Sequence, residues 1–434
     1  MEMISVIDEE TMAKQAHFET NRQTIAPAVD HGRRQEEQLN DGTILCEWLP
    51  EELAIINGPI ERLHDFERIC VYNLLHDPED QGNVVGVLVP GVVPMLTVTN
   101  VKHWQPCDLK AKLENDYESS GSLAMECTIR AYATHCRRQR STPNFQRFDL
   151  IITKRALCRL FRCCANEIIS VSSRAHRFRN HYTLVVQRVG RTLLIDRDAE
   201  DEQRTGKAKL LNDFYHHLTA TPGGLSSAHE LVSYRLGRLN LLVTTAVNVA
   251  DYPRQVHDAH AQEPVSWNLT NADAAFERLL PPGEATVSAW YAACARSVHA
   301  RTFEQVEATT RSTYINRIVT DGGHLPNLLF CGARRLLVGV HSNSHCDHVL
   351  EHSVDSLIDQ RLMFGRTSHK IVLAKMAVLL EEVARIVRES VSSLYQLDCD
   401  FDESERLLLM SCAEKDAKRL VSRSDLIDLL FPQD

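Results

Sequence analysis

The densest group of potential metal ligands in this sequence lies between residues 341 and 352. It comprises His341, His345, Cys346, Asp347, His348 and His352. On a helix, His345, His348 and His352 would share one face, as a zinc site needs. The segment follows a run typical of a strand and is rich in serine and asparagine. We therefore expect a loop that carries surface histidines and no metal site.

Other motifs that bind cations or nucleotides are incomplete. Asp398, Asp400 and Asp402 begin like a calcium loop. However, Glu403 stands where glycine must turn the chain, and Leu409 stands where a bidentate glutamate is needed. The sequence has neither a P-loop nor the glycine-rich dinucleotide pattern. We expect no nucleotide cofactor.

Basic residues concentrate in one part of a chain whose net charge is −10. Residues 131–191 contain 13 Lys and Arg against 2 acids. This block is a candidate RNA-binding surface; the alternative is a solvated surface that pairs with acidic parts of the same chain. The candidate RNA-binding residues are Arg137, Arg138, Arg140, Arg155, Arg159, Arg162, Arg174, Arg177 and Arg179, with Arg235 outside the block. Phe178 and Tyr182 would either stack on bases or pack in the core.

Local patterns indicate the elements that must position these residues. Residues 148–153 form an apolar strand that leads directly into a helix over 154–164, whose apolar residues follow helical spacing. The other predicted elements are a strand over 84–89, a helix over 122–136, a hairpin around Gly190, a long strand region over 230–250, a strand over 334–341 and a helix over 368–395 capped by Ser368.

The composition is that of a globular protein with an acidic start. Of the 434 residues 44% are hydrophobic, and no apolar run approaches the ~20 residues that span a bilayer. The 13 cysteines are scattered, and the N-terminus lacks the plan of a signal peptide, so we expect an intracellular protein, nuclear or cytoplasmic, with reduced thiols. We expect an acidic, disordered lead over residues 1–40. Residues 41–434 should form one α+β domain that ends in the long helix and an acidic segment.

Four segments in order resemble a known family. Residues 233–248, SYRLGRLNLLVTTAVN, resemble the strand S-Y-R-F-G-G-L-x-x-L-V-R-x-E-V-D of the divergent fungal branch of decapping exoribonucleases. Residues 88–91, 148–161 and 335–341 resemble that branch's V-P-G turn, its F-D-x-V-T-x-R-x-x-L-R-K-L step and its N-L-I-V-G-Y-H strand. The resemblance implies a PD-(D/E)xK nuclease fold with a mixed β-sheet core and packed helices.

The resemblance also implies a set of metal-binding positions, and this sequence departs from it. The E-x-D pair falls on Ala246 and Asn248, and an alignment through Arg296 puts the E-φ-K strand on Ala292, Ala293 and Cys294. An upstream glutamate falls near Tyr215, and a glutamine near Gly332. Alanine has no ligand atoms, and an amide is a poor Mg²⁺ ligand beside a carboxylate.

We therefore expect a catalytically degenerate decapping-nuclease-like protein that binds RNA through residues 131–191 or has a regulatory role, with no cofactor. The first alternative is an active RNA 5′-end hydrolase that uses Mg²⁺ or Mn²⁺ bound by relocated ligands. Its candidate residues are Asp213, Glu230, Asp251 and Glu284, assisted by His229 or Lys209. The second alternative is a protein-interaction module that uses the acidic ends and the 368–395 helix.

Overall fold

In the computed structural model of the protein, residues 35–434 form one compact unit. The structure describes residues 38–39, 42–50, 52–53, 58–60, 62–76, 84–89, 91, 93–96, 121–165, 181–197, 214–215, 218–220, 227–251, 275–278, 303–312, 324–342, 345–359, 368–400, 406–412, 419–421, 427 and 430. The expected lead over residues 1–40 lies outside this set except for Gln38 and Leu39, which form a strand.

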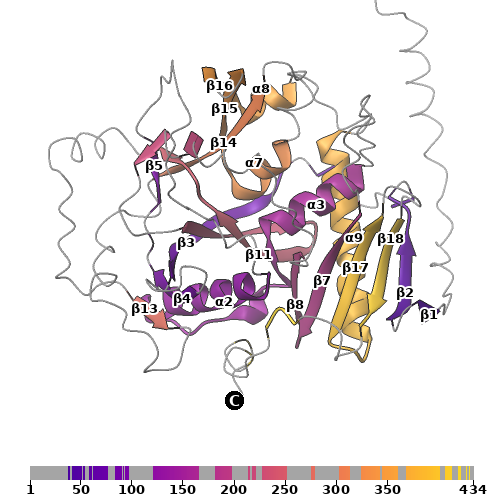
Figure 1. The fold of residues 1–434 in the computed structure, drawn as a ribbon. Helices are drawn as coiled ribbons and strands as arrows, with labels where there is room; N and C mark the ends of the chain where they lie inside the picture. Colours follow the sequence, from indigo (N-terminus) through magenta and orange to yellow (C-terminus); the bar gives the residue numbers. More distant parts are fainter. Residues whose placement is uncertain are drawn as a thin grey trace, which may run out of the picture. The chain divides into compact units, whose positions relative to one another are not determined.

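A large mixed sheet organises the described part of the chain (Figure 1). In spatial order its strands are β1 (Gln38–Leu39), β2 (Gly42–Trp48), β18 (Arg406–Ser411), β17 (Leu394–Asp400), β7 (His181–Val189), β8 (Thr192–Arg197), β6 (Leu150–Thr153), β11 (Leu239–Ala246), β10 (Ser227–Leu236), β3 (His64–His76), β4 (Val84–Val89) and β13 (Ala275–Arg278). β6 is parallel to both of its neighbours, β8 and β11. The carboxyl ends of these three strands therefore meet at one edge.

A smaller sheet begins where β11 ends. Its strands in spatial order are β16 (His345–Ser353), β15 (Arg335–Ser342), β14 (Glu304–Ser312), β12 (Ala250–Asp251), β5 (Met95–Leu96) and β9 (Thr219–Ala220). β14 pairs in parallel with β15 and antiparallel with β12. Only three residues separate β11 from β12, so the carboxyl edge of the large sheet leads directly to β14.

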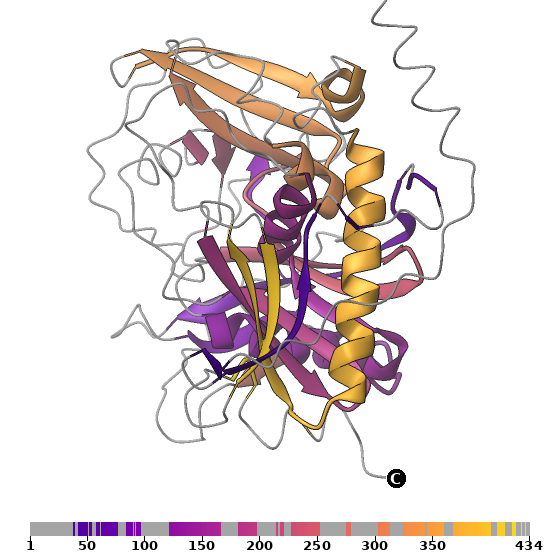
Figure 2. The same ribbon diagram turned by 90° about the vertical axis from the view of Figure 1, so that its right-hand side faces the viewer.

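Helices pack on both faces of the large sheet (Figures 1 and 2). The side chains of β6 alternate: Leu150 and Ile152 belong to one apolar core and Ile151 to another. The first core contains α3 (Lys154–Ala165), α9 (His369–Glu389) and part of α7 (Leu325–Cys331), whereas the second contains α2 (Gly121–Arg138). The short elements η2 (Phe145–Arg147) and α8 (Val354–Asp359) complete the described helices.

The predictions from local patterns are confirmed for the strand-to-helix step, α2, β4, β15 and the hairpin around Gly190. Thr153 ends β6, and its hydroxyl accepts a hydrogen bond from the Ala156 amide at 3.3 Å, which caps α3. The thiols are also as expected, because the ten cysteines whose side chains the structure describes are free and eight of them are buried.

Two predictions about strands and helices need correction. The region 230–250 is not one long strand but an antiparallel hairpin, β10 and β11, that turns at Gly237 with φ +60°. The 368–395 helix is capped by Ser368 as predicted but ends at Glu389. Val391 is 98% exposed, and Leu394 begins β17, so both leave the helical stripe.

The segment that follows this helix contains two strands that the sequence patterns did not predict. The chain returns to the large sheet after α9, where β17 pairs with β7 and β18 pairs with β2. Asp398 and Asp400 of the rejected calcium loop lie on β17. No described helix is long and apolar enough to span a membrane.

Candidate functional site

A buried ion pair lies at the carboxyl edge of the large sheet. Lys154 follows the last residue of β6, and its Nζ lies 2.6 Å from Glu307 Oε1 on β14. Both side chains are only 12% exposed. Burial acts to lower the pKa of Lys154, but the Glu307 carboxylate and the thiols of Cys331 and Cys158 raise it above its ordinary value on balance. The lysine is therefore protonated at neutral pH.

Further donors converge on the same Glu307 oxygen. Cys331 Sγ at the end of α7 lies 3.4 Å away, and Gln305 Nε2 lies 3.5 Å away. Gln305 Nε2 also donates to the Ala246 carbonyl at 3.2 Å, which ties β14 to the end of β11. Gln305 Oε1 is buried and has no hydrogen-bond partner among the residues that the structure describes.

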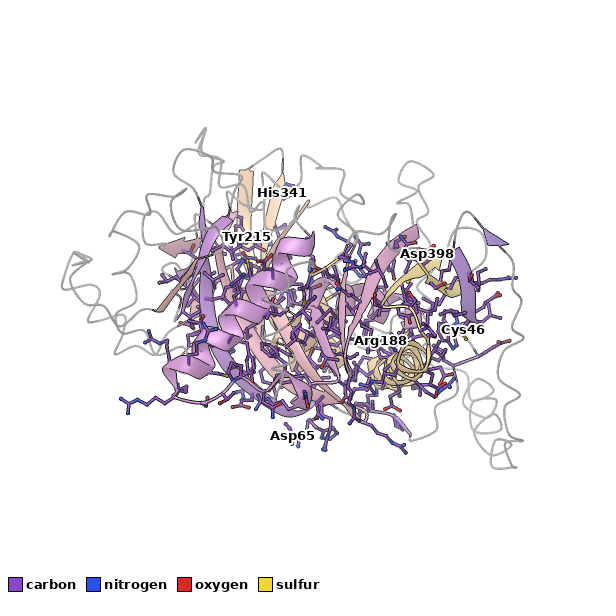
Figure 3. All side chains as sticks on the ribbon, turned by 90° about the horizontal axis from the view of Figure 1, so that it is seen from below. Cys46, Asp65, Arg188, Tyr215, His341 and Asp398 are labelled. Carbon is purple, nitrogen blue, oxygen red and sulfur yellow. The ribbon has the colours of Figure 1, made fainter. Side chains whose placement is uncertain are left out.

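Tyr215 closes the site from the side of the small sheet. Its hydroxyl donates to the Ala308 carbonyl at 2.9 Å and is hydrogen-bonded to the Asn248 side chain. Burial, followed by the Glu307 carboxylate, raises the pKa of Tyr215, so the phenol stays protonated. Figure 3 shows Tyr215 beside the part of the small sheet that carries His341, away from Asp398 on the large sheet.

The start of α3 is held in place by a second buried acid. The Thr153 hydroxyl donates to Asp196 Oδ1 on β8 at 2.7 Å, and the same oxygen accepts from the Arg197 amide at 2.8 Å. Burial raises the pKa of Asp196 to about 6, although these hydrogen bonds act to lower it. The contacts fix the end of β6 and thereby the position of Lys154.

The structure brings together three of the positions that the resemblance named: Tyr215, Ala246 and Asn248. Gly332 lies just after α7, as the C-cap of that helix. Ala292 and Cys294 lie outside the described residues. Glu307 and Lys154 were not among the site residues predicted from the sequence.

A signal for Glu307 was present in the sequence. Residues 307–311, EATTR, follow the E-φ-K-T-R pattern with glutamate, threonine and arginine retained and Thr309 in place of the lysine. No comparable signal marks Lys154, because it lies 153 residues before its partner Glu307 in the sequence.

The two proposed substitute acids that the structure describes, Glu230 and Asp251, have ion-pair partners outside this site. Glu230 is fully buried on β10 and pairs with Arg68 Nε at 3.3 Å. Burial raises the pKa of Glu230 to about 7, although Arg68 acts to lower it. Asp251 on β12 is paired with Arg335. Asp213, Glu284 and Lys209 lie outside the described residues; His229 is buried and stacks on Tyr72.

The histidine-rich segment was predicted to be a loop, and this is wrong. Residues 345–353 form β16, the antiparallel partner of β15. His348 and His352 lie on one face of this strand, but four positions along a strand separate their Cα atoms by about 13 Å. The side chain of His345 is outside the described set. Within the described ranges, no three His, Cys, Asp or Glu side chains are placed to hold a metal ion.

The described arginines of the basic block do not share one face. Arg137, Arg138 and Arg140 are exposed at the end of α2, on one side of the large sheet. The candidates Arg155, Arg159 and Arg162 lie on α3, on the other side. Arg174, Arg177 and Arg179 are not among the described residues, and Arg235 pairs with Asp65 at 3.2 Å.

The aromatic residue proposed to stack on bases belongs to the core. Tyr182 is 5% exposed and packs in the α3–α9 core, where its hydroxyl donates to the Arg159 carbonyl at 2.7 Å. The Arg159 guanidinium lies 5.1 Å from the centre of the Tyr182 ring. The core alternative is therefore correct for Tyr182, whereas Phe178 lies outside the described residues.

Solved structures of Rai1 from three organisms resemble most of this chain. Rai1 of S. pombe in complex with 3'-FADP matches with a TM-score of 0.54 and 10% identity, covering 85% of this chain and 99% of its own. Rai1 of Scheffersomyces stipitis in complex with (3'-NADP)+ and calcium ion gives 0.55 and 11%, covering 91% and 100%. Rai1 of Candida albicans in complex with pU5-Mn2+ gives 0.55 and 9%, covering 87% and 98%.

At this identity the likeness establishes the fold. No protein-family profile matches the sequence, and no curated protein matches it either. The mixed sheet, its two helical layers and the near-complete coverage of each relative agree with the predicted α+β class. The chain has the fold of the Rai1 decapping nucleases.

Proposed function

We propose that this protein is a catalytically degenerate relative of the decapping nucleases that binds RNA without hydrolysing it. The observation that supports this proposal is the Lys154–Glu307 ion pair. When E-φ-K-T-R is placed on β14, Glu307 is the one carboxylate among the positions that should bind metal. The other positions hold Tyr215, Ala246 and Asn248.

The Mg²⁺ or Mn²⁺ of the related fold does not fit these residues. Both ions are bound through oxygen ligands, in which carboxylates supply the negative charge. Here the single carboxylate is neutralised by an ammonium 2.6 Å away and accepts from two further donors. We therefore derive no metal-dependent hydrolysis from this site.

Hydrolysis is tested directly with RNA that carries a 5′ triphosphate, in Mn²⁺ or Mg²⁺. The protein should release no more product than a buffer control, and calorimetric titration with Mn²⁺ should show no binding. Product release that is lost on Glu230→Gln or Asp251→Asn would establish the active hydrolase with relocated ligands instead.

A row of arginines on α3 is the surface that we propose for RNA. Helix α3 contains four basic residues and no acid, and Arg155, Arg159 and Arg162 follow the i, i+4, i+7 spacing of one helical face. The row begins beside Lys154 and extends about 10 Å along the helix axis. A single-stranded backbone that ends at the site could therefore contact all three arginines.

Three phosphate contacts give a defined salt dependence. With a slope of about −0.7 per contact, the affinity for single-stranded RNA should fall about 20-fold between 50 and 200 mM salt. Arg155→Gln, Arg159→Gln and Arg162→Gln together should weaken binding and remove most of this slope. The matched control combines Arg137→Gln, Arg138→Gln and Arg140→Gln on the other side of the sheet, and it should bind normally.

The outcomes separate the alternatives. A loss of binding in the control triple variant alone would move the RNA surface to α2. An absence of RNA binding at 50 mM salt would remove the RNA part of the proposal and leave the protein-interaction module. Measurements by fluorescence anisotropy, with unfolding curves to show that each variant is folded, are sufficient.

A further inference from the structure

Several oxygen-bearing side chains gather at the Lys154–Glu307 pair. Glu307 supplies a carboxylate, and Tyr215 and Asn248 form a hydrogen-bonded pair of oxygen-bearing side chains beside it. Gln305 Oε1 is buried and makes no hydrogen bond to any part of the chain that the structure describes. A buried acceptor without a donor is costly, and a nearby positive charge reduces that cost.

The Lys154 ammonium supplies the positive charge that balances these oxygen-bearing side chains. Lys154 reaches them from the first position of α3, and its Nζ contacts the same carboxylate oxygen that Cys331 and Gln305 approach. Helix α3 has no acid in its first turn, so the carboxylate of Glu307 is the partner that the structure provides for Lys154.

We infer that the Lys154 ammonium takes the place of a divalent cation in this site and closes it to metal ions. This inference deepens the proposed function and rests on it, because the native site is taken to work without metal. Its consequence is specific: removal of the ammonium leaves room and an unbalanced carboxylate, and the remaining oxygens then bind a hard divalent cation.

The experiment uses the full chain with Lys154→Ala and Mn²⁺ as the probe. In EDTA the variant should unfold at a lower temperature than the native protein. Mn²⁺ at 100 times its Kd should raise the Tm of the variant by at least about 2 °C, because a ligand that binds only the folded state stabilises it. The native protein should show no Mn²⁺-dependent shift.

Two controls locate the effect. Lys154→Ala combined with Glu307→Gln should lose the response to Mn²⁺, because the carboxylate is gone. Lys375→Ala removes another partly buried lysine, whose ammonium donates to the Pro50 carbonyl at 2.7 Å, and it should gain no response. If Lys154→Ala does not fold in EDTA, recovery of the native circular dichroism on addition of Mn²⁺ is the readout.

Failure of this inference and failure of the proposed function are distinguishable. A folded Lys154→Ala that ignores Mn²⁺ overturns the inference, and so does a response that persists without Glu307. Neither result affects RNA binding by the native protein in EDTA. Conversely, a native protein that binds no RNA overturns the RNA proposal, whereas the Mn²⁺ response of Lys154→Ala would still stand.

Discussion

Breaking the Lys154–Glu307 pair should destabilise the fold strongly, whereas replacing both residues should not. Both side chains are 12% exposed, and their charged atoms lie 2.6 Å apart. Removal of one member leaves a buried charge, which typically costs about 3–5 kcal/mol, but a well-packed apolar replacement of the whole pair is often neutral. We therefore consider Lys154→Met, Glu307→Leu and the double variant.

The residue that has lost its partner can become neutral by losing or gaining a proton. The free energy of that step sets an upper limit on the destabilisation caused by each single substitution. A stranded lysine can lose its proton at pH 7, which costs about 4.6 kcal/mol from an ordinary pKa of about 10.4. A stranded glutamate can gain a proton for about 3.7 kcal/mol from an ordinary pKa of about 4.3. Glu307 keeps Cys331 and Gln305 as donors, so Lys154→Met should cost less than Glu307→Leu.

Urea unfolding at pH 7, followed by circular dichroism, measures the free energy of unfolding of the native protein, the two single variants and the double variant, which together form a double-mutant cycle. Each single variant should lose about 3–4 kcal/mol, and the double variant should lose less than about 1.5 kcal/mol. An exposed pair at the same distance, Arg385–Glu382 on α9, is the control, and Arg385→Met should cost less than about 1 kcal/mol. Additive effects of the two buried substitutions would refute the reasoning, because additivity means that the charges do not depend on each other.

Two further predictions concern buried carboxylates and glycines. The pKa of Glu230 is raised to about 7, so the folded state holds a proton that the unfolded state loses above about pH 4.5. The free energy of unfolding should therefore fall by up to about 1.4 kcal/mol per pH unit between these two values and level off above pH 7. Urea midpoints of the native protein and Glu230→Gln measured from pH 5 to 8 test this, and equal slopes would contradict it. Gly332→Ala should destabilise by more than Gly58→Ala: both glycines have positive φ, but only at Gly332 would a Cβ lie 2.3 Å from the Phe66 ring. Equal shifts in Tm for the two variants would show that the Phe66 ring moves away from the new Cβ without a cost in stability.

Part of the candidate site was accessible from the sequence. The motif around Ser233 pointed to Ala246 and Asn248 from consecutive residues alone, and in the structure Ala246 ends β11 while Asn248 follows two residues later. The alignment through Arg296 missed the EATTR run at Glu307, although that run preserves three residues of the expected pattern. Lys154 could not be found in this way, because its role comes from a partner on another sheet.

The sequence by itself determined the local elements. The strand that runs into α3, helix α2, the hairpin at Gly190 and the Ser368 cap all follow from periodicity and capping within short windows. Only the tertiary structure decided the rest. The arginines of one basic block separate to two sides of the sheet because β6 passes between α2 and α3. The charges at the site balance because the end of β6 meets β14, and such a pairing depends on chain topology, which no local pattern encodes.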